Sequence, residues 1–135
     1  MTLIVLSDTD LNDSSKTLTV PANYVYEILY GQIKFISDAT VGNRQIVLQI
    51  TDDDDVQIIS FSAGAVQAAS LTRYYNFTQG GTHETSFIDS TINVPLCDEL
   101  VIPENYKIVL YDSAAISAAG DDMTVKLVVR RLRRF

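Results

Sequence analysis

The sequence has one cysteine, one histidine and no tryptophan, and each scarcity excludes a class of site. A single cysteine, Cys97, cannot form an intrachain disulfide, so the folded state depends on its core or on assembly. Cys97 lies between Leu96 and Asp98, and we expect a small buried apolar residue rather than a nucleophile. A single histidine, His83, excludes a multi-histidine metal cluster within one chain, and its Gly-rich surroundings predict an exposed loop.

The chain also lacks the sequence signatures of common enzymes and of segments that enter membranes. It contains no G-x-S-x-G nucleophile elbow, no phosphate-binding loop and no dinucleotide fingerprint. The start of the chain has no basic region and reaches Asp8 after a short apolar run, unlike a signal peptide or a membrane helix. We therefore expect no enzymatic activity, no cofactor and no membrane partner.

What the sequence does contain is enough apolar material for one core. The chain has 135 residues, of which 47% are hydrophobic and 20% are charged, as in ordinary globular proteins. This size predicts a single domain over residues 1–135. We expect a short N-terminal strand or arm at residues 1–17 and a basic C-terminal end at residues 130–135.

Positive charge is concentrated at that basic end. The formal net charge is −7, and it becomes −11 when the four arginines among the last six residues are subtracted: Arg130, Arg131, Arg133 and Arg134. An acidic body is repelled by nucleic acid and by anionic membranes, so we expect no direct nucleic-acid binding. The arginines are our candidate interface residues, because guanidinium groups suit carboxylates on an acidic partner. The alternative is a solvated tail that only adds solubility.

Alternation of polar and apolar residues predicts strands along most of the chain. Residues 24–30 and 32–37 flank Gly31 and predict one long bent strand or two consecutive strands. Residues 44–51 and 56–61 flank four aspartates and predict a hairpin. Residues 123–132 predict a last strand in which Val125, Leu127 and Val129 share one face. About eight strands and no long helix favour an all-β fold, an antiparallel β-sandwich of jelly-roll-like winding.

Two acidic segments are candidate cation sites. Asp52 to Asp55 would accept a hard cation such as Ca²⁺, but consecutive aspartates lack the alternating spacing that directs oxygens to one ion, and a solvated hairpin tip is the preferred interpretation. Residues 8–13 alternate oxygen ligands but lack the Gly and Glu of a calcium loop. We expect no metal at either segment.

One aromatic cluster is a candidate platform for sugars or bases. Tyr74, Tyr75 and Phe77 lie close together in a predicted strand. Core packing and an interface are the preferred interpretations, because tryptophan is absent and basic residues are sparse there.

Three stretches resemble a known family: residues 19–24 (TVPANY), 39–47 (ATVGNRQIV) and 111–125 (YDSAAISAAGDDMTV). Together they are similar to small β-sandwich structural proteins of tailed bacteriophages, in particular capsid decoration or cement proteins, over about Leu18 to Arg131. The resemblance implies a jelly-roll-like subunit, a homotrimer, that binds the major capsid protein or another virion protein and stabilises the head lattice. It implies a location on the capsid surface after assembly in the bacterial host cytoplasm, and it supplies no catalytic residues.

Three alternatives stay open. One is another virion part, such as a head fibre, baseplate or tail-associated subunit. The second is a carbohydrate-binding module for the host surface. The third is a small hydrolase with an unrecognised site. The arginine-rich end belongs to none of the resembling stretches, so its role is open as well.

Overall fold

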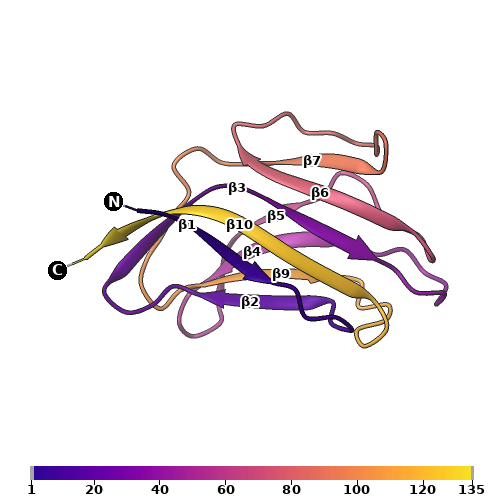
Figure 1. Cartoon of the computed structure of the whole chain (residues 1–135), viewed down its shortest axis with the longest axis horizontal. Helices are drawn as coiled ribbons and strands as arrows, with labels where there is room; N and C mark the ends of the chain where they lie inside the picture. The colour runs from indigo at the N-terminus through magenta and orange to yellow at the C-terminus, as the bar shows by residue number, and fades with distance from the viewer. Residues whose placement is uncertain (1, 135) are drawn as a thin grey trace.

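The structure is a computed structural model that describes residues 2–134, so Met1 and Phe135, at the ends of the predicted domain, lie outside it. The described residues form ten strands and no helix (Figure 1). In chain order the strands are β1 (Thr2–Asp8), β2 (Ser15–Thr19), β3 (Tyr24–Ile36), β4 (Ile46–Thr51), β5 (Gln57–Ser62), β6 (Thr72–Gln79), β7 (Thr91–Leu96), β8 (Val101–Ile102), β9 (Lys107–Asp112) and β10 (Asp122–Arg133). Over residues 2–134 there is thus no helix long and apolar enough to span a membrane.

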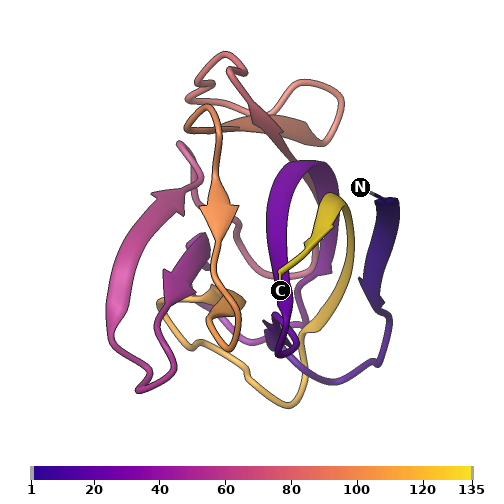
Figure 2. The same ribbon diagram turned by 90° about the vertical axis from the view of Figure 1, so that its left-hand side faces the viewer.

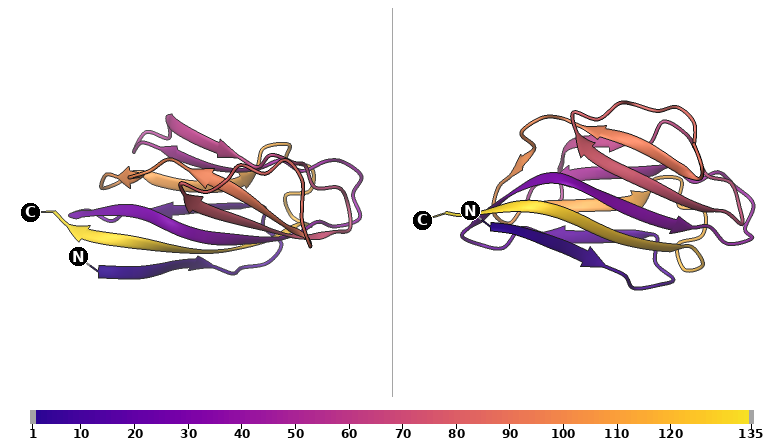
Figure 3. Two further views of the ribbon diagram at one scale, coloured as in Figure 1. Left: turned by 90° about the horizontal axis from the view of Figure 1, so that it is seen from above. Right: turned by 45° about the horizontal axis from the view of Figure 1, so that its top comes forward.

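The strands form two sheets that pack face to face. The larger sheet has the order β1-β10-β3-β6-β7, with β8 paired to part of β3, and the smaller has the order β2-β9-β4-β5. All pairs are antiparallel except β6 with β7. The two layers are seen edge-on in the left panel of Figure 3. The predicted all-β sandwich is confirmed.

Eight of the strands form nested antiparallel pairs around the turn at residues 52–56. From the inside outward, β4 pairs with β5, β3 with β6, β2 with β9 and β1 with β10. β7 and β8 lie in the connection between β6 and β9. The predicted jelly-roll-like winding remains an interpretation, with which this nested order agrees.

The sequence did not predict β2 or β8, and the physical reasons differ. In β2 the buried positions alternate as in any half-buried strand, but Lys16 occupies one of them and is only 1% exposed. Because a lysine occupies an inward position, the sequence of β2 does not show the alternation of polar and apolar residues that predicts a strand. β8 has two residues, too few for a periodic pattern. At the N-terminus β1 pairs with β10 over its whole length, so this segment is an edge strand rather than a free arm.

Strand β3 is the single long bent strand that the sequence predicted as one of two possibilities. Its pairing with β10 shifts by one residue, because Val128 pairs with Tyr30 while Val129 pairs with Ile28, which leaves Leu29 as a bulge. Near the bulge, Gly31 lies against β10. A Cβ built on Gly31 would stand 2.5 Å from the carbonyl oxygen of Lys126, so the close approach of the two strands requires glycine.

The core lies between the two sheets. Val125, Leu127 and Val129 are 0% exposed, which confirms the predicted inward face of β10. The most deeply buried partners from the other strands are aromatic or branched: Ile28, Ile33, Phe35, Ile46, Leu48, Tyr75, Phe77, Ile92, Ile108 and Leu110. The expectation of a buried Cys97 is wrong, because this residue follows the end of β7 and its side chain is exposed.

Candidate functional site

Strand β10 brings the candidate arginines to one end of the sandwich. The sequence predicted a last strand over residues 123–132, and the observed β10 runs one residue further, paired with β3 as far as Arg133 opposite Tyr24. The pairing register places four segments at this end: residues 20–23, 52–56, 103–106 and 131–134. We call it the arginine end, and Figure 2 looks onto it, with the C-terminus near the centre.

Side chains of other strands and loops contact Arg130, Arg131 and Arg134. Arg130 Nη1 donates to Glu27 Oε1 at 2.7 Å, and Arg134 Nη1 donates to Glu104 Oε1 at 3.0 Å. The Arg131 guanidinium lies 4.8 Å from the centre of the Tyr24 ring, a cation–π contact.

Arg133, the fourth, is exposed at the end of β10. The main chain is also fixed there, since the Arg134 N–H donates to the Asn23 carbonyl at 2.7 Å. The basic segment is therefore an ordered surface up to Arg134 rather than a loose tail.

The four aspartates form the predicted hairpin tip at the same end. Asp52 Oδ1 accepts the N–H groups of Asp54 and Val56, each at 2.9 Å, and so closes the turn. Asp55 has a φ of +64° and its carboxylate binds Lys107. Asp53 and Asp54 are exposed, and within residues 2–134 no ion pair joins either of them to a cation. No group of three or more His, Cys, Asp or Glu side chains in that range converges as a metal site.

Exposed apolar side chains lie among these charges. Val56, in the turn after the aspartates, is 57% exposed, and Leu132, near the end of β10, is 40% exposed. Val101, on the neighbouring strand β8, is 52% exposed. Charged groups of both signs that surround exposed apolar residues are the composition of a protein interface.

A second candidate surface is the outer face of the larger sheet, which faces the viewer in Figure 1. It has two hollows, of about 470 Å³ and about 250 Å³. Gln32 and Lys126 line both hollows, so the two adjoin. We call them together the outer-face groove, lined by Val5, Tyr30, Gly31, Gln32, Lys34, Tyr74, Asn76, Phe77, Thr78, Thr124, Lys126 and Val128.

A row of amide side chains runs from the floor of this groove to Asn93 on the neighbouring strand β7. Gln32 Nε2 donates to Asn76 Oδ1 at 2.8 Å, and Asn76 Nδ2 donates to Asn93 Oδ1 at 3.4 Å. This ladder joins β3, β6 and β7 because the three residues lie opposite one another in the pairing register. The three residues of the candidate aromatic platform do not share one surface. Tyr75 and Phe77 are 0% exposed in the core, while Tyr74 lines the groove.

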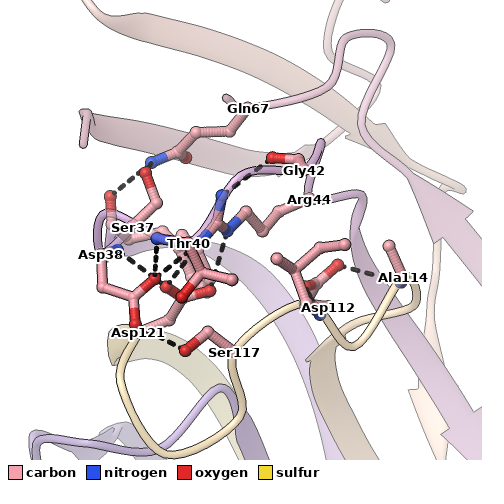
Figure 4. Close-up of polar contacts among 12 residues, drawn as sticks. Ser37, Asp38, Thr40, Gly42, Arg44, Gln67, Asp112, Ala114, Ser117 and Asp121 are labelled. Carbon is pink, nitrogen blue, oxygen red and sulfur yellow. Dashed lines mark hydrogen bonds and ion pairs between the residues drawn. The ribbon is translucent and has the colours of Figure 1, made fainter. Parts of the chain in front are cut away.

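A buried ionic network, shown in Figure 4, joins the loop before β4 to the start of β10. Arg44 and Asp121 are both 0% exposed, and Arg44 Nε donates to Asp121 Oδ2 at 3.0 Å. Arg44 Nη2 also donates to Asp38 Oδ1 at 2.9 Å. A hydrogen bond from the Ser117 hydroxyl, with the nearby Arg44 charge, lowers the pKa of Asp38 below its usual value. Every charged group has a partner, so the network is a structural clamp.

A second buried cation, Lys16, joins β2 to the loop after β1. Its Nζ donates to Asp8 Oδ1 at 3.1 Å and to the Asp10 carbonyl at 2.8 Å. Desolvation raises the pKa of Asp8, but the Lys16 hydrogen bond, the Asp10 N–H and the Lys16 charge together outweigh it and lower that pKa. With a third contact to Asp13 Oδ2 at 3.4 Å, the lysine thus binds three oxygens of the segment considered as a calcium loop. Sequence reasoning missed Lys16 and Arg44, and their only signal is a basic residue between stretches predicted to be buried.

The remaining predicted residue, His83, is exposed in the connection between β6 and β7, as expected. The arginine end and the outer-face groove are the two candidate surfaces that the described residues offer. Comparisons of the chain with protein-family models, with curated proteins and with solved structures find no match.

Proposed function

We propose that the protein is a virion structural subunit, a capsid decoration or cement protein that forms homotrimers and stabilises a phage head lattice. The observation that carries the proposal is the arginine end, where opposite charges lie on one surface without pairing to each other. Arg131 and Arg134 have other partners, whereas Asp53 and Asp54 have no ion pair within residues 2–134.

A ring of subunits needs two different patches on each chain, one of which contacts the other patch of its neighbour. The arginines and the acidic turn meet this requirement, because guanidinium groups keep spare N–H donors after one contact and can bind a second carboxylate. A single exposed pair contributes about 0–1 kcal/mol, but pairs repeated around a ring and across a lattice add through avidity. Val56 and Leu132 supply apolar surface between the charges.

The fold agrees with this role. The nested strand order supports a jelly-roll-like winding, an architecture that viral capsid and lectin domains share. The buried pairs of Arg44 and Lys16 tie loops to strands in the part of the molecule where β10 begins, and a lattice-binding subunit needs such rigidity. These observations support a structural subunit as a class, and the phage head as its setting comes from the family resemblance.

The test is a charge-reversal series. Light scattering of the wild-type chain should give a trimer mass, and the chain should co-sediment stoichiometrically with purified phage capsids. Arg131→Glu with Arg134→Glu, or Asp53→Arg with Asp54→Arg, should each dissociate the trimer. The quadruple variant, in which both patches exchange charge, should restore it.

Asp10→Arg with Asp89→Arg is the matched control, because it changes net charge as much as Asp53→Arg with Asp54→Arg, on residues outside the arginine end, and should leave assembly intact. A wild-type chain that stays monomeric at high concentration would contradict the trimer. Trimers that do not co-sediment with any capsid preparation would contradict the proposed role as a decoration protein.

A further inference from the structure

The outer-face groove has the charge of a site for an acidic ligand. Lys34 and Lys126 line it from adjacent strands, and within residues 2–134 neither forms an ion pair. In a chain of net charge −7, two ammonium groups on one sheet face without acidic partners form a local positive patch. Carboxylates of a ligand would accept charge-assisted hydrogen bonds from the ammonium groups of both lysines.

The amide ladder supplies groups that match hydroxyls. Within the ladder, Gln32 Oε1 and Asn93 Nδ2 have no hydrogen-bond partner among residues 2–134, so one acceptor and one donor are available to a ligand. A hydroxyl both donates and accepts, and neighbouring hydroxyls on a sugar ring present both functions side by side. The ladder also fixes the amide orientations before any ligand arrives.

Tyrosines border both parts of the groove. Tyr30 is 55% exposed beside the larger hollow, and Tyr74 lines the smaller one. An aromatic ring provides a flat apolar surface with a polar tip, on which the C–H face of a sugar ring can stack while its hydroxyls reach polar neighbours. Val5 and Val128 extend this apolar surface along the larger hollow.

The same observations disfavour other occupants. A peptide strand gains its affinity from main-chain hydrogen bonds at a sheet edge, but this groove lies on a face whose backbone groups are already paired. A second copy packed on the same face by two-fold symmetry would bring lysines toward lysines.

We propose that the outer-face groove binds an acidic glycan, a chain of sugar rings that carry carboxylates. Lys34 and Lys126 bind the carboxylates, Gln32 binds ring hydroxyls with Asn93 beside the groove, and Tyr30 and Tyr74 stack on the rings. The groove and the arginine end have no residue in common, so glycan binding and the proposed assembly can be tested independently.

The test is titration calorimetry of the full chain with oligogalacturonate, a hyaluronan oligosaccharide and an oligosialic acid. At least one should bind, and for oligogalacturonate the methyl-esterified form, which has the same sugars without the charge, is the matched ligand control. Polyglutamate is the acidic peptide control. Absence of binding to all of the acidic glycans overturns the proposal, as does equal binding of the neutral ester or of polyglutamate.

Variants place the site. Lys34→Met with Lys126→Met should weaken binding about tenfold or more, since it removes both charge-assisted contacts. Gln32→Ala should weaken it as well, while Lys107→Met, a lysine outside the groove, should not. Unfolding temperatures of all variants show whether each remains folded. Full affinity in the folded Lys34 and Lys126 double variant would overturn the assignment of the groove.

Discussion

Arg44 and Asp121 form an ion pair from which water is excluded, with neither side chain exposed. Two hydrogen bonds join them, from Arg44 Nε to Oδ2 at 3.0 Å and from Nη2 to Oδ1 at 3.2 Å. Asp121 Oδ1 also accepts the N–H of Asp38 at 2.8 Å. The pair therefore fixes the loop that precedes β4 against the turn that precedes β10.

Asp121→Asn should be among the most damaging single substitutions. It leaves the Arg44 charge buried with one carboxylate, Asp38, and removal of one member of a buried pair costs about 3–5 kcal/mol. Urea unfolding should show that loss. Arg44→Met combined with Asp121→Leu removes both charges and should cost much less than the sum of the two single changes. A loss below about 1 kcal/mol for Asp121→Asn would show that the pair does not clamp the fold.

Acid should destabilise the protein through Asp38. Hydrogen bonds from the Ser117 hydroxyl and the Thr40 N–H, with the nearby Arg44 charge, hold the pKa of Asp38 below its unfolded value of about 3.9. A depressed folded pKa contributes stability above the unfolded pKa and loses it as the pH falls through the folded pKa. Urea midpoints measured from pH 6 to pH 2 should fall below about pH 4, and Asp38→Asn should flatten that decline. If the urea midpoints of the wild type and of Asp38→Asn fall equally steeply with pH, carboxylates other than Asp38 cause the acid sensitivity.

Gly31→Ala should destabilise the fold at the close approach of β3 and β10. Its Cβ would lie 2.5 Å from the Lys126 carbonyl oxygen and 2.8 Å from the Leu127 Cα, both main-chain atoms that cannot turn aside. Overpacking of this kind costs about 1–3 kcal/mol. Thermal unfolding of Gly31→Ala beside the wild type measures this loss. A Gly31→Ala protein as stable as the wild type would exclude the clash.

Asp52 should matter to stability more than its neighbours in the acidic turn. Asp52→Ala removes the acceptor of two main-chain N–H groups and should cost about 1–2 kcal/mol. Asp53→Asn removes an exposed charge that has no partner within residues 2–134 and should change stability by less than about 0.5 kcal/mol. Chemical unfolding of both variants makes the comparison, and an equal loss would mean that charge, rather than turn closure, governs this hairpin.

Calcium should bind the acidic turn weakly or not at all. One Asp52 oxygen already accepts two N–H groups and the Asp55 carboxylate binds Lys107, so few oxygens remain to surround an ion. Calorimetric titration with Ca²⁺ should show no micromolar affinity. Micromolar binding that disappears in Asp53→Asn with Asp54→Asn would establish a cation site at this turn.

Strands were predictable from the sequence where alternation is regular and uninterrupted. The inward face of Val125, Leu127 and Val129 follows from period two alone, and so does the hairpin around the aspartates. Two strands were missed, β2 because Lys16 takes a buried position and β8 because it has two residues. The nested pairing depends on contacts between distant strands, which no local pattern encodes.

The candidate surfaces were predictable only in part. Composition identified the arginines, but it could not show that Arg130, Arg131 and Arg134 contact Glu27, Tyr24 and Glu104, since these partners come from other strands and loops. Cys97 was expected inside because cysteine is usually buried, yet it follows the last inward residue of β7 and points to solvent. The outer-face groove has residues from β1, β3, β6 and β10, so it exists only after the sheet has formed.

The pairing of β1 with β10 has a consequence for synthesis on the ribosome. Thr2 lies opposite Arg131. The apolar strand β1 therefore has no partner strand until β10, near the end of the described chain, has been translated. The β4–β5 hairpin needs no such delay, because its strands are neighbours in sequence. Non-local pairing of this kind slows folding, since a long loop must close before the contacts form. Nascent chains should therefore acquire protease resistance in a late step, after β10 emerges, and Leu3 with Val5 makes β1 a natural binding segment for chaperones in the interval.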